Sequence, residues 1–275
     1  MFRKYGILSV IIIILTQLNL IFKIEPFYTW TFPIIWISFI FFLDALNYKI
    51  RGNSLIMNRS YTIGGMFIIS AMLWWAFEFI NIFVISNWGY TGMSRLGIYA
   101  NIFGTISFAT VLPAFFELVE LIKSVHLFDK KKLKKKHKIS KRFLHIMILL
   151  GVMCFILPLI IPKYTFPLVW VSLFLILDPI NYINNLPSTI RHLKDRKLTT
   201  PLSLLLAGII MGFLWEFWNY WAPVKWHYTI PYFDFIRIFE MPLLGYLGYF
   251  GFALELYAIY WFVMGMFSKK EKDLK

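Results

Sequence analysis

Cysteine is almost missing from this chain, and so are the motifs of several enzyme classes. Cys154 is the single cysteine in 275 residues, which excludes an intrachain disulfide and a site with several thiolate ligands. No histidine belongs to a cluster with metal-ligand spacing, so we expect no metal site. The sequence also lacks a glycine-rich nucleotide loop, a serine nucleophile elbow and a His-Glu-x-x-His motif. We therefore predict a protein that uses no metal and no cofactor.

Charged residues are few, and they occur in groups. They make up 15% of the chain against 59% hydrophobic residues, and they separate long unbroken apolar runs. This pattern is typical of a polytopic helical membrane protein. The net charge of +14 could indicate a nucleic-acid partner, but basic residues between apolar runs are typical of connecting loops. We predict an all-α membrane protein whose partners are membrane lipids and not nucleic acid; the sequence predicts no oligomeric state.

Eight apolar runs have the length of a membrane span. A helix rises about 1.5 Å per residue, so about 20 apolar residues cross the hydrocarbon layer. The predicted spans are 6–23, 31–48, 61–86, 98–122, 144–161, 165–183, 201–222 and 240–264. The first run follows a basic start, as in a signal peptide. No small-residue cleavage site follows it, so we expect a retained first helix.

Lys and Arg are unequally divided between the two sides of these spans. If the N-terminus is cytoplasmic, five of the 28 lie in outer segments, which leaves 23 inside; the outer five are Lys23, Arg95, Lys163, Lys225 and Arg237. This bias predicts a multi-pass protein of the cell membrane with both termini in the cytoplasm. Segment 129–142 is the most basic, and it is either a solvated connector or a contact for anionic lipids.

The polar residues of the first half recur in the second half. Two pairs are 134 residues apart: Asp44 with Asp178, and Asn47 with Asn181. Four further pairs are 138 residues apart: Glu78 with Glu216, Asn81 with Asn219, Trp88 with Trp226, and Glu117 with Glu255. Apolar composition alone does not explain acids and amides that recur in register. Each half has four spans, an even number, so the halves run in the same direction and we predict two parallel four-helix repeats. The predicted division is 1–123 and 144–268 for the repeats, 124–143 for a basic linker and 269–275 for a basic tail.

The recurring polar residues are candidates for a functional site. Carboxylates are costly to bury in lipid, and those that occur there often serve a site. Candidate catalytic residues are Glu216, Glu78, Asp178, Asp44, Glu255 and Glu117. Candidate substrate-binding residues are Asn219, Asn81, Asn181, Asn47, Trp215, Trp74, Trp226 and His227. No Lys or Arg lies deep in a span, so we expect some of these acids to be protonated and bonded to an amide or an indole. The alternative is that these side chains only hold the helices together.

The acids fall into two layers, and the halves differ beside the deeper one. Glu78 and Glu216 lie near the middle or outer part of their spans, and the remaining candidate acids lie toward the cytoplasmic ends. Gly208 and Gly212 precede Glu216, where the first half has larger residues. Small residues allow close approach of a neighbouring helix. We therefore expect a single cavity to lie on the side of Glu216.

Three functions fit these patterns. An enzyme that acts on a lipid or isoprenoid would use one carboxylic acid as a proton donor, a second carboxylate as a base and aromatic faces for a developing cation. A proton- or cation-coupled transporter would use the same carboxylates to carry a charge. A scaffold subunit would use them only to specify helix packing. Of the three functions, we favour the enzyme by a narrow margin.

Overall fold

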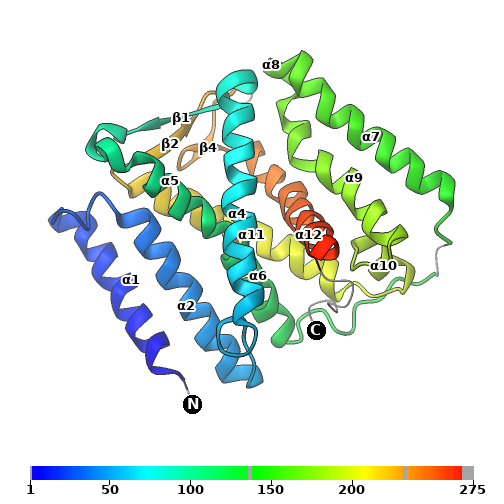
Figure 1. Ribbon diagram of the computed structural model, residues 1–275, viewed down its shortest axis with the longest axis horizontal. Coiled ribbons are helices and arrows are strands. Elements are labelled where there is room, and N and C mark those ends of the chain that lie inside the picture. The colour runs from blue at the N-terminus through cyan, green and yellow to red at the C-terminus, as the bar shows by residue number, and fades with distance from the viewer. Residues whose placement is uncertain (1, 136–137, 232–233, 268–275) are drawn as a thin grey trace.

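Most of the chain is helical. In the computed structural model, which describes residues 2–135, 138–231 and 234–267, helices are joined by short segments (Figure 1). Eight helical segments in these ranges are long and apolar enough to cross a membrane: Lys4–Phe22, Thr31–Arg51, Ser60–Ile85, Gly97–Ser124, Lys141–Ile160, Pro162–Ile183, Thr199–Trp221 and Leu243–Phe267. Each overlaps one predicted run, so that part of the prediction is confirmed. The structure is compatible with an integral membrane protein, and the predicted tail 269–275 lies outside the described residues.

The first four spans contain a break that the apolar pattern does not reveal. Their elements are α1 (Lys4–Phe22), α2 (Thr31–Arg51), the short α3 (Leu55–Asn58), α4 (Ser60–Ile80), the π-helical turn η1 (Asn81–Ile85), the 3-10 turns η2 (Met93–Arg95) and η3 (Gly97–Tyr99), α5 (Ala100–Ala109) and α6 (Val111–Ser124). The break lies at Thr110, between α5 and α6. The Ser70 hydroxyl of α4 donates to the Phe108 carbonyl at 2.6 Å and accepts from the Leu112 N–H at 3.0 Å. Ser70 thus satisfies backbone groups that the break leaves open.

The last four spans follow a similar order. Their elements are α7 (Lys141–Ile160), the short α8 (Pro162–Thr165), η4 (Phe166–Leu168), α9 (Val169–Ile183), α10 (Thr189–Lys194), α11 (Thr199–Trp221), η5 (Leu243–Leu247) and α12 (Gly248–Phe267). α1 packs along α2 and α7 along α9, whereas α6 packs against α11. α1 and α7 leave many large apolar side chains exposed, as lipid-facing helices do. The best-buried side chains lie between the other long helices.

Two strands from the separate halves form a short ribbon that the all-α prediction lacks. β1 (Trp88–Thr91) pairs antiparallel with β2 (Lys225–Tyr228), and a second small sheet joins β3 (Arg237–Ile238) to β4 (Met241–Pro242). In the ribbon Trp88 lies opposite Tyr228, Gly89 opposite His227 and Tyr90 opposite Trp226. Of these residues, Trp226 and His227 were predicted as substrate-binding candidates, and no strand was predicted here. A four-residue strand whose partner is far away in the chain gives too little local pattern to be recognised.

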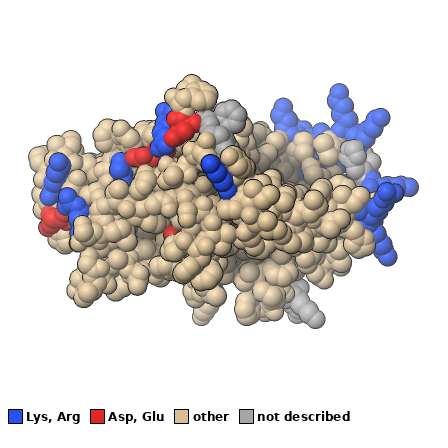
Figure 2. All heavy atoms as spheres, turned by 90° about the horizontal axis from the view of Figure 1, so that it is seen from above, with Lys and Arg blue, Asp and Glu red and all other residues tan. Residues whose placement is uncertain are grey.

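The ribbon lies at one end of the bundle. It is at the upper end in Figure 1, and α10 and the N-terminus are at the lower end. Seen from the ribbon end, most of the surface is uncharged, and Lys and Arg gather mainly at one side (Figure 2). Segment 128–133 is held near α10 and α11, because the Leu133 N–H donates to the Arg196 carbonyl at 3.2 Å and the Leu198 N–H donates to the Lys131 carbonyl at 3.3 Å.

Glycines on α11 allow α12 to approach closely, as expected from the sequence. A Cβ atom on Gly208 would lie 2.6 Å from the Tyr249 carbonyl oxygen, and one on Gly212 would lie 2.3 Å from the Tyr249 ring. The Tyr249 ring therefore occupies the space that a side chain at Gly212 would need. The tyrosine is held against α11 at the level of Glu216.

Replacing Gly212 with Ala should therefore destabilise the protein by about 1–3 kcal/mol, because the added methyl group displaces the Tyr249 ring. The measurement is unfolding of the purified protein in detergent, followed by near-UV circular dichroism. Gly65 on α4 is the matched control, because a Cβ atom there meets no other atom within 4 Å. Equal stability of Gly212→Ala and Gly65→Ala would contradict the close approach.

Candidate functional site

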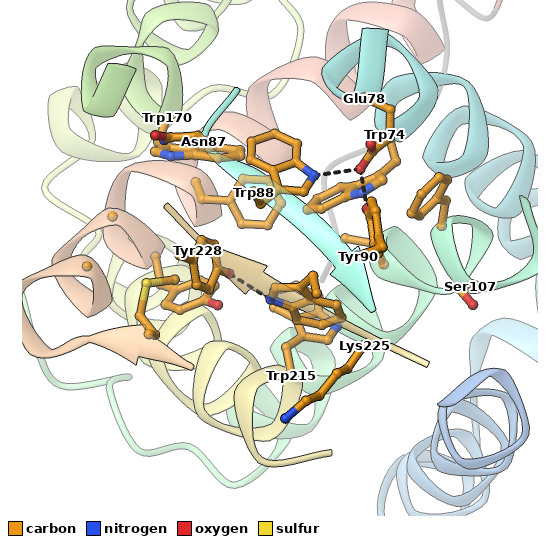
Figure 3. Close-up of a pocket in the computed structure, with 18 of the residues that line it drawn as sticks. Trp74, Glu78, Asn87, Trp88, Tyr90, Ser107, Trp170, Trp215, Lys225 and Tyr228 are labelled. Atoms are coloured by element: carbon orange, nitrogen blue, oxygen red, sulfur yellow. Dashed lines mark hydrogen bonds between the residues drawn. The ribbon is translucent and has the colours of Figure 1, made fainter. Parts of the chain in front are cut away.

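A cavity of about 630 Å³ lies between the halves of the chain, against the ribbon (Figure 3). Its walls come mainly from α4, β1 and α5 of the first half and from α9, α11, β2, η5 and α12 of the second. Most lining side chains are apolar, and six tryptophans are among them: Trp74, Trp75, Trp88, Trp170, Trp215 and Trp226. The volume is within the range of small-molecule sites, about 300–1,000 Å³.

Glu78 is a carboxylate on the wall of this cavity. It lies on α4 near the π-helical turn η1, and only 3% of it is exposed. Trp88 donates its indole N–H to Glu78 Oε1 at 2.8 Å, and the Tyr90 hydroxyl donates to the same oxygen. Figure 3 shows both side chains directed from β1 toward this carboxyl group. Two donors on one oxygen fix the orientation of the carboxyl group in the cavity wall.

Asn81 and Asn219 do not line the cavity; they hold the strands that do. The Asn81 side chain accepts from the Asn87 N–H at 2.8 Å and donates to the Trp88 carbonyl at 2.9 Å. The Asn219 side chain accepts from the Trp226 N–H and donates to the Trp226 carbonyl, both at 2.9 Å. The two amides thus fix the start of each ribbon strand at the end of the preceding helix. Their contacts correspond across the offset of 138.

Glu216 lies behind the cavity wall and does not line the cavity. Its Oε1 accepts from the hydroxyl groups of Tyr228 and Tyr249, each at 2.8 Å, and both tyrosines line the cavity. Trp226 donates its indole N–H to the Tyr228 oxygen at 2.9 Å. Within the described residues Glu216 Oε2 is buried and has no hydrogen-bond partner.

The cavity therefore does not lie directly beside Glu216, where the glycines of the second half predicted it. We expected it beside Glu216, because Gly212 creates space there. The Tyr249 ring fills that space and separates Glu216 from the cavity. The corresponding residue of the first half, 138 positions earlier, is Val111, which has no hydroxyl group and leaves Glu78 on the cavity surface.

Tyr90 and Tyr228 keep their protons over a wide pH range. Burial raises the pKa of each phenol well above its usual range, and the neighbouring carboxyl group, Glu78 or Glu216, raises it further. Both groups lie in the ribbon, outside the eight spans. They are therefore hydrogen-bond donors to the carboxyl groups at neutral pH.

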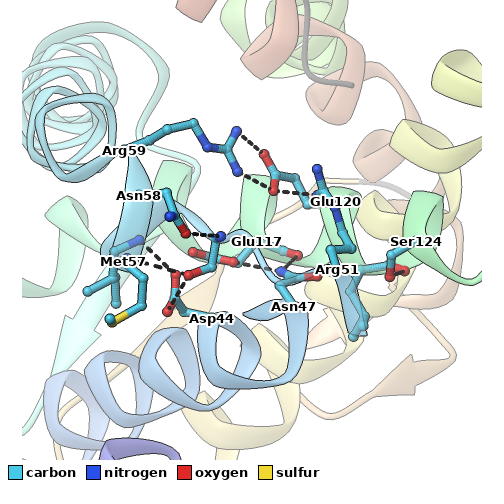
Figure 4. A network of polar contacts seen from close by, with 12 residues as sticks. Asp44, Asn47, Arg51, Met57, Asn58, Arg59, Glu117, Glu120 and Ser124 are labelled. Carbon is cyan, nitrogen blue, oxygen red and sulfur yellow. Dashed lines mark hydrogen bonds and ion pairs between the residues drawn. The ribbon is translucent and has the colours of Figure 1, made fainter. Parts of the chain in front are cut away.

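Asp44 and Asp178 are outside the cavity lining and hold the short helices α3 and α10. Asp44 accepts from the Ile56 N–H at 2.7 Å and from the hydroxyl groups of Ser54 and Tyr5 at 3.0 and 2.5 Å (Figure 4). Asp178 accepts from the N–H groups of Thr189 and Ile190 at 2.7 and 3.0 Å. Free N–H groups at a helix start favour a carboxylate. Both acids are fully buried and make this contact at equivalent positions.

Glu117, Glu255, Asn47 and Asn181 also lie outside the cavity lining, in helix–helix contacts. Asn47 donates to the Glu117 side chain at 2.7 Å and to its carbonyl at 2.9 Å, which joins α2 to α6. Asn181 donates to the Ala258 carbonyl at 2.8 Å, and Glu255 accepts from the Leu173 N–H at 2.9 Å, which joins α9 to α12. The four side chains are fully buried. Their contacts fit the alternative that some polar residues hold the helices together.

One buried acid has cationic partners that the span pattern did not predict. Glu120 of α6 is fully buried, and it forms ion pairs with Arg51 at 2.7 Å and with Arg59 at 2.6 Å (Figure 4). The arginines are at the end of α2 and just before α4, and their long side chains reach back to α6. The residue at the equivalent place in the second half is Ala258, so this cluster belongs to the first half alone.

His227 is on the ribbon face that is turned away from the cavity. Its neighbours Trp226 and Tyr228 line the cavity, and side chains alternate along a strand. A Cβ atom on Gly89 would lie 3.1 Å from the imidazole ring, so the ring packs directly on the glycine. Trp74 and Trp215, by contrast, are on the cavity wall, each close to the Phe252 ring, with centroid distances of 5.8 and 5.9 Å.

The candidate site thus contains Glu78, Trp74, Trp215 and Trp226 on the cavity wall and Glu216 behind it. Tyr90, Tyr228 and Tyr249 are additional members, and sequence reasoning did not assign them to the site. Tyr90 and Tyr228 recur at the offset of 138, which could have identified them; Tyr249 gives no such signal. No family model, no curated protein and no solved structure matches this chain.

Proposed function

We propose that this protein is a membrane enzyme that acts on a lipid or isoprenoid in the cavity, with Glu78 as the proton donor. One observation carries the proposal: among the described residues that line the cavity, Glu78 is the one carboxyl group, in a wall that is otherwise mostly aromatic and aliphatic. An acid in such an environment is suited to general acid catalysis, which typically contributes about 10²–10⁴ in rate.

The reaction uses two carboxyl groups and no cofactor. The Glu78 O–H bond breaks, and its proton forms a bond to a carbon or oxygen atom of the lipid, which supplies the electron pair. The cation that results is stabilised by the faces of Trp74, Trp215 and their aromatic neighbours. The cation then gives a proton to the Tyr249 or Tyr228 oxygen while that hydroxyl passes its own proton to Glu216. One turnover moves one proton from Glu78 to Glu216, and this proton returns through the same tyrosine hydroxyl to the cavity and to Glu78 before the next turnover.

The remaining candidates have structural roles in this proposal. Asn81 and Asn219 position the ribbon, and Asp44 and Asp178 secure the short helices. Glu117, Glu255, Asn47 and Asn181 join neighbouring helices, and His227 closes the ribbon on the other face. Each assignment is supported by the hydrogen bonds and packing contacts given above.

The domain arrangement is also a proposal: two parallel four-helix repeats, 1–123 and 144–268, with a basic linker 124–143, a basic tail 269–275 and both termini in the cytoplasm. The ribbon register supports it. Gly89 lies opposite His227, which is 138 residues later, and this is the same offset that relates the two halves. The other pairs are mirrored about this point, as a two-fold axis along the membrane normal requires. Location in the cell membrane and the cytoplasmic termini are supported by the excess of Lys and Arg on one side.

Coupled transport has less support than catalysis. A transported ion would need a polar path past both Glu78 and Glu216. Glu216 is separated from the cavity by Tyr228 and Tyr249, and the walls near Glu78 are largely apolar. These features favour the binding of a hydrophobic molecule.

A cavity-filling substitution tests whether the cavity holds a lipid. Gly248 lines the cavity, and a Cβ atom there would meet only the Trp170 ring, at 3.8 Å, so a leucine would extend into the cavity. We expect the purified wild-type protein to carry a distinct lipid in organic extracts, measured by mass spectrometry, and Gly248→Leu to lose it. Gly65→Leu is the control, because Gly65 has open space around it and does not line the cavity. The same lipid profile in all three proteins would contradict the proposal.

A further inference from the structure

The cavity reaches the outer surface of the bundle between two membrane segments. Ile82 of η1 and Leu247 of η5 both line the cavity, yet they are 61% and 60% exposed. Trp75 of α4 and Leu244 of η5 also combine a place on the cavity wall with partial exposure. A side chain that is both exposed and part of a cavity wall marks an edge of the opening.

This opening faces the region where hydrocarbon is expected. Its edges lie in the apolar segments Ser60–Ile85 and Leu243–Phe267, and the side chains named above are apolar. The ribbon covers the cavity at the end of the bundle, with Trp88, Tyr90, Trp226 and Tyr228 directed inward. A molecule that diffuses within the bilayer can therefore reach Glu78 without first passing through water.

The charges around the cavity limit what can occupy it. Of the described lining residues, Lys225 is the one with a cationic side chain, and its ammonium group is 2.6 Å from a carboxyl oxygen of Glu240. That carboxylate already neutralises the cation that a phosphate group would need. A phosphate would instead approach Glu78 in a region of low dielectric, where an unpaired charge is strongly disfavoured. A lipid without formal charge has no such penalty.

We propose that the opening between α4 and η5 admits an uncharged, isoprenoid-type lipid from the bilayer and that phospholipids are excluded. The reactive end lies beside Glu78 among the tryptophan faces, and the hydrocarbon tail extends through the opening. The assignment rests on the proposed function, since it names the substrate class and the access route of the same cavity.

Photolabelling of the full-length protein in nanodiscs tests the substrate class. One probe is an isoprenoid alcohol with a diazirine group, and the other is phosphatidylglycerol with a diazirine in its acyl chain. We expect the alcohol to label cavity peptides of α9 and α12, such as those with Trp170 and Phe252, and an excess of unlabelled alcohol to abolish the label. The phospholipid should label only outer faces such as that of α7. Equal labelling of the cavity by both probes would overturn the proposal.

A substitution at the opening tests the access route. Leu247→Trp adds bulk at its edge, so labelling of the cavity by the alcohol should become slower than in the wild type. Leu149→Trp is the matched control, because Leu149 is 61% exposed on α7 and does not line the cavity. An unchanged labelling rate in Leu247→Trp would overturn the lateral route. If the alcohol labels the cavity as expected but Glu78→Gln is fully active, binding stands and the proposed catalysis fails; absence of cavity label from both probes overturns both.

Discussion

Replacing Glu78 with Gln should reduce turnover by about 10²–10⁴-fold without removing the lipid from the cavity. An amide cannot supply the proton, but its oxygen can still accept hydrogen bonds from Trp88 and Tyr90. The ribbon and the shape of the cavity should therefore be kept. The measurement is conversion of the lipid that is extracted from the wild-type protein, assayed in nanodiscs, together with the amount of lipid bound.

The Glu216→Gln variant belongs in the same experiment. It should also lose activity, because the Tyr249 and Tyr228 hydroxyls would have no carboxylate to receive a proton. Glu25→Gln is a suitable control, since Glu25 is a partly exposed acid in the segment between α1 and α2. If Glu78→Gln and Glu216→Gln are both folded and fully active, catalysis and coupled transport both fail, and a scaffold role is the remaining explanation.

Replacing Trp36 with Ala should lower the free energy of unfolding by about 3–5 kcal/mol, the usual range for loss of a large core aromatic. Trp36 of α2 is fully buried, and its ring packs on Trp215 and Trp218 of α11, with centroid distances of 5.7 and 4.8 Å. The substitution would leave a cavity between the halves of the chain, where the surrounding rings cannot collapse fully.

The same substitution at an exposed tryptophan is the control for Trp36. Trp221 is at the end of α11 and is 53% exposed, so Trp221→Ala removes the same atoms with little loss of packing. The measurement is thermal unfolding in a mild detergent, with the lipid content of each sample checked in parallel. Equal effects of the two substitutions would contradict the placement of Trp36 at the centre of the core.

The spans were predictable from the sequence because a membrane helix depends on one local property, a long apolar run. The polar residues were predictable as a set but not in their roles. Asp44 and Asp178 were candidates for catalysis, yet they accept hydrogen bonds from helices that begin about ten residues later. Ser54 and Ser188 cap those short helices, and they are also 134 residues apart. This recurrence could have indicated a structural role for the two aspartates.

The separation of Glu216 from the cavity could not be predicted. It depends on the Tyr249 ring, which fits against Gly212 from a neighbouring helix. The sequence shows a glycine and a tyrosine that are far apart, and only the packing of α11 against α12 shows that one fills the space left by the other. The arginine pair on Glu120 has a similar cause, because long side chains at the end of one span and just before the next reach back to a buried acid.

The pairing of Gly89 with His227 has a consequence for how this chain could have arisen. In an ancestral dimer of identical four-helix proteins, the residue at this point would lie opposite its own copy on the symmetry axis. Two histidines would be crowded at the site, because a Cβ atom at Gly89 would already be 3.1 Å from the His227 ring. Duplication and fusion of a gene would make the two positions independent, so that one could be glycine while the other is histidine. A single chain can thus place a glycine opposite a histidine, a pairing that is unavailable to two identical subunits at their symmetry axis.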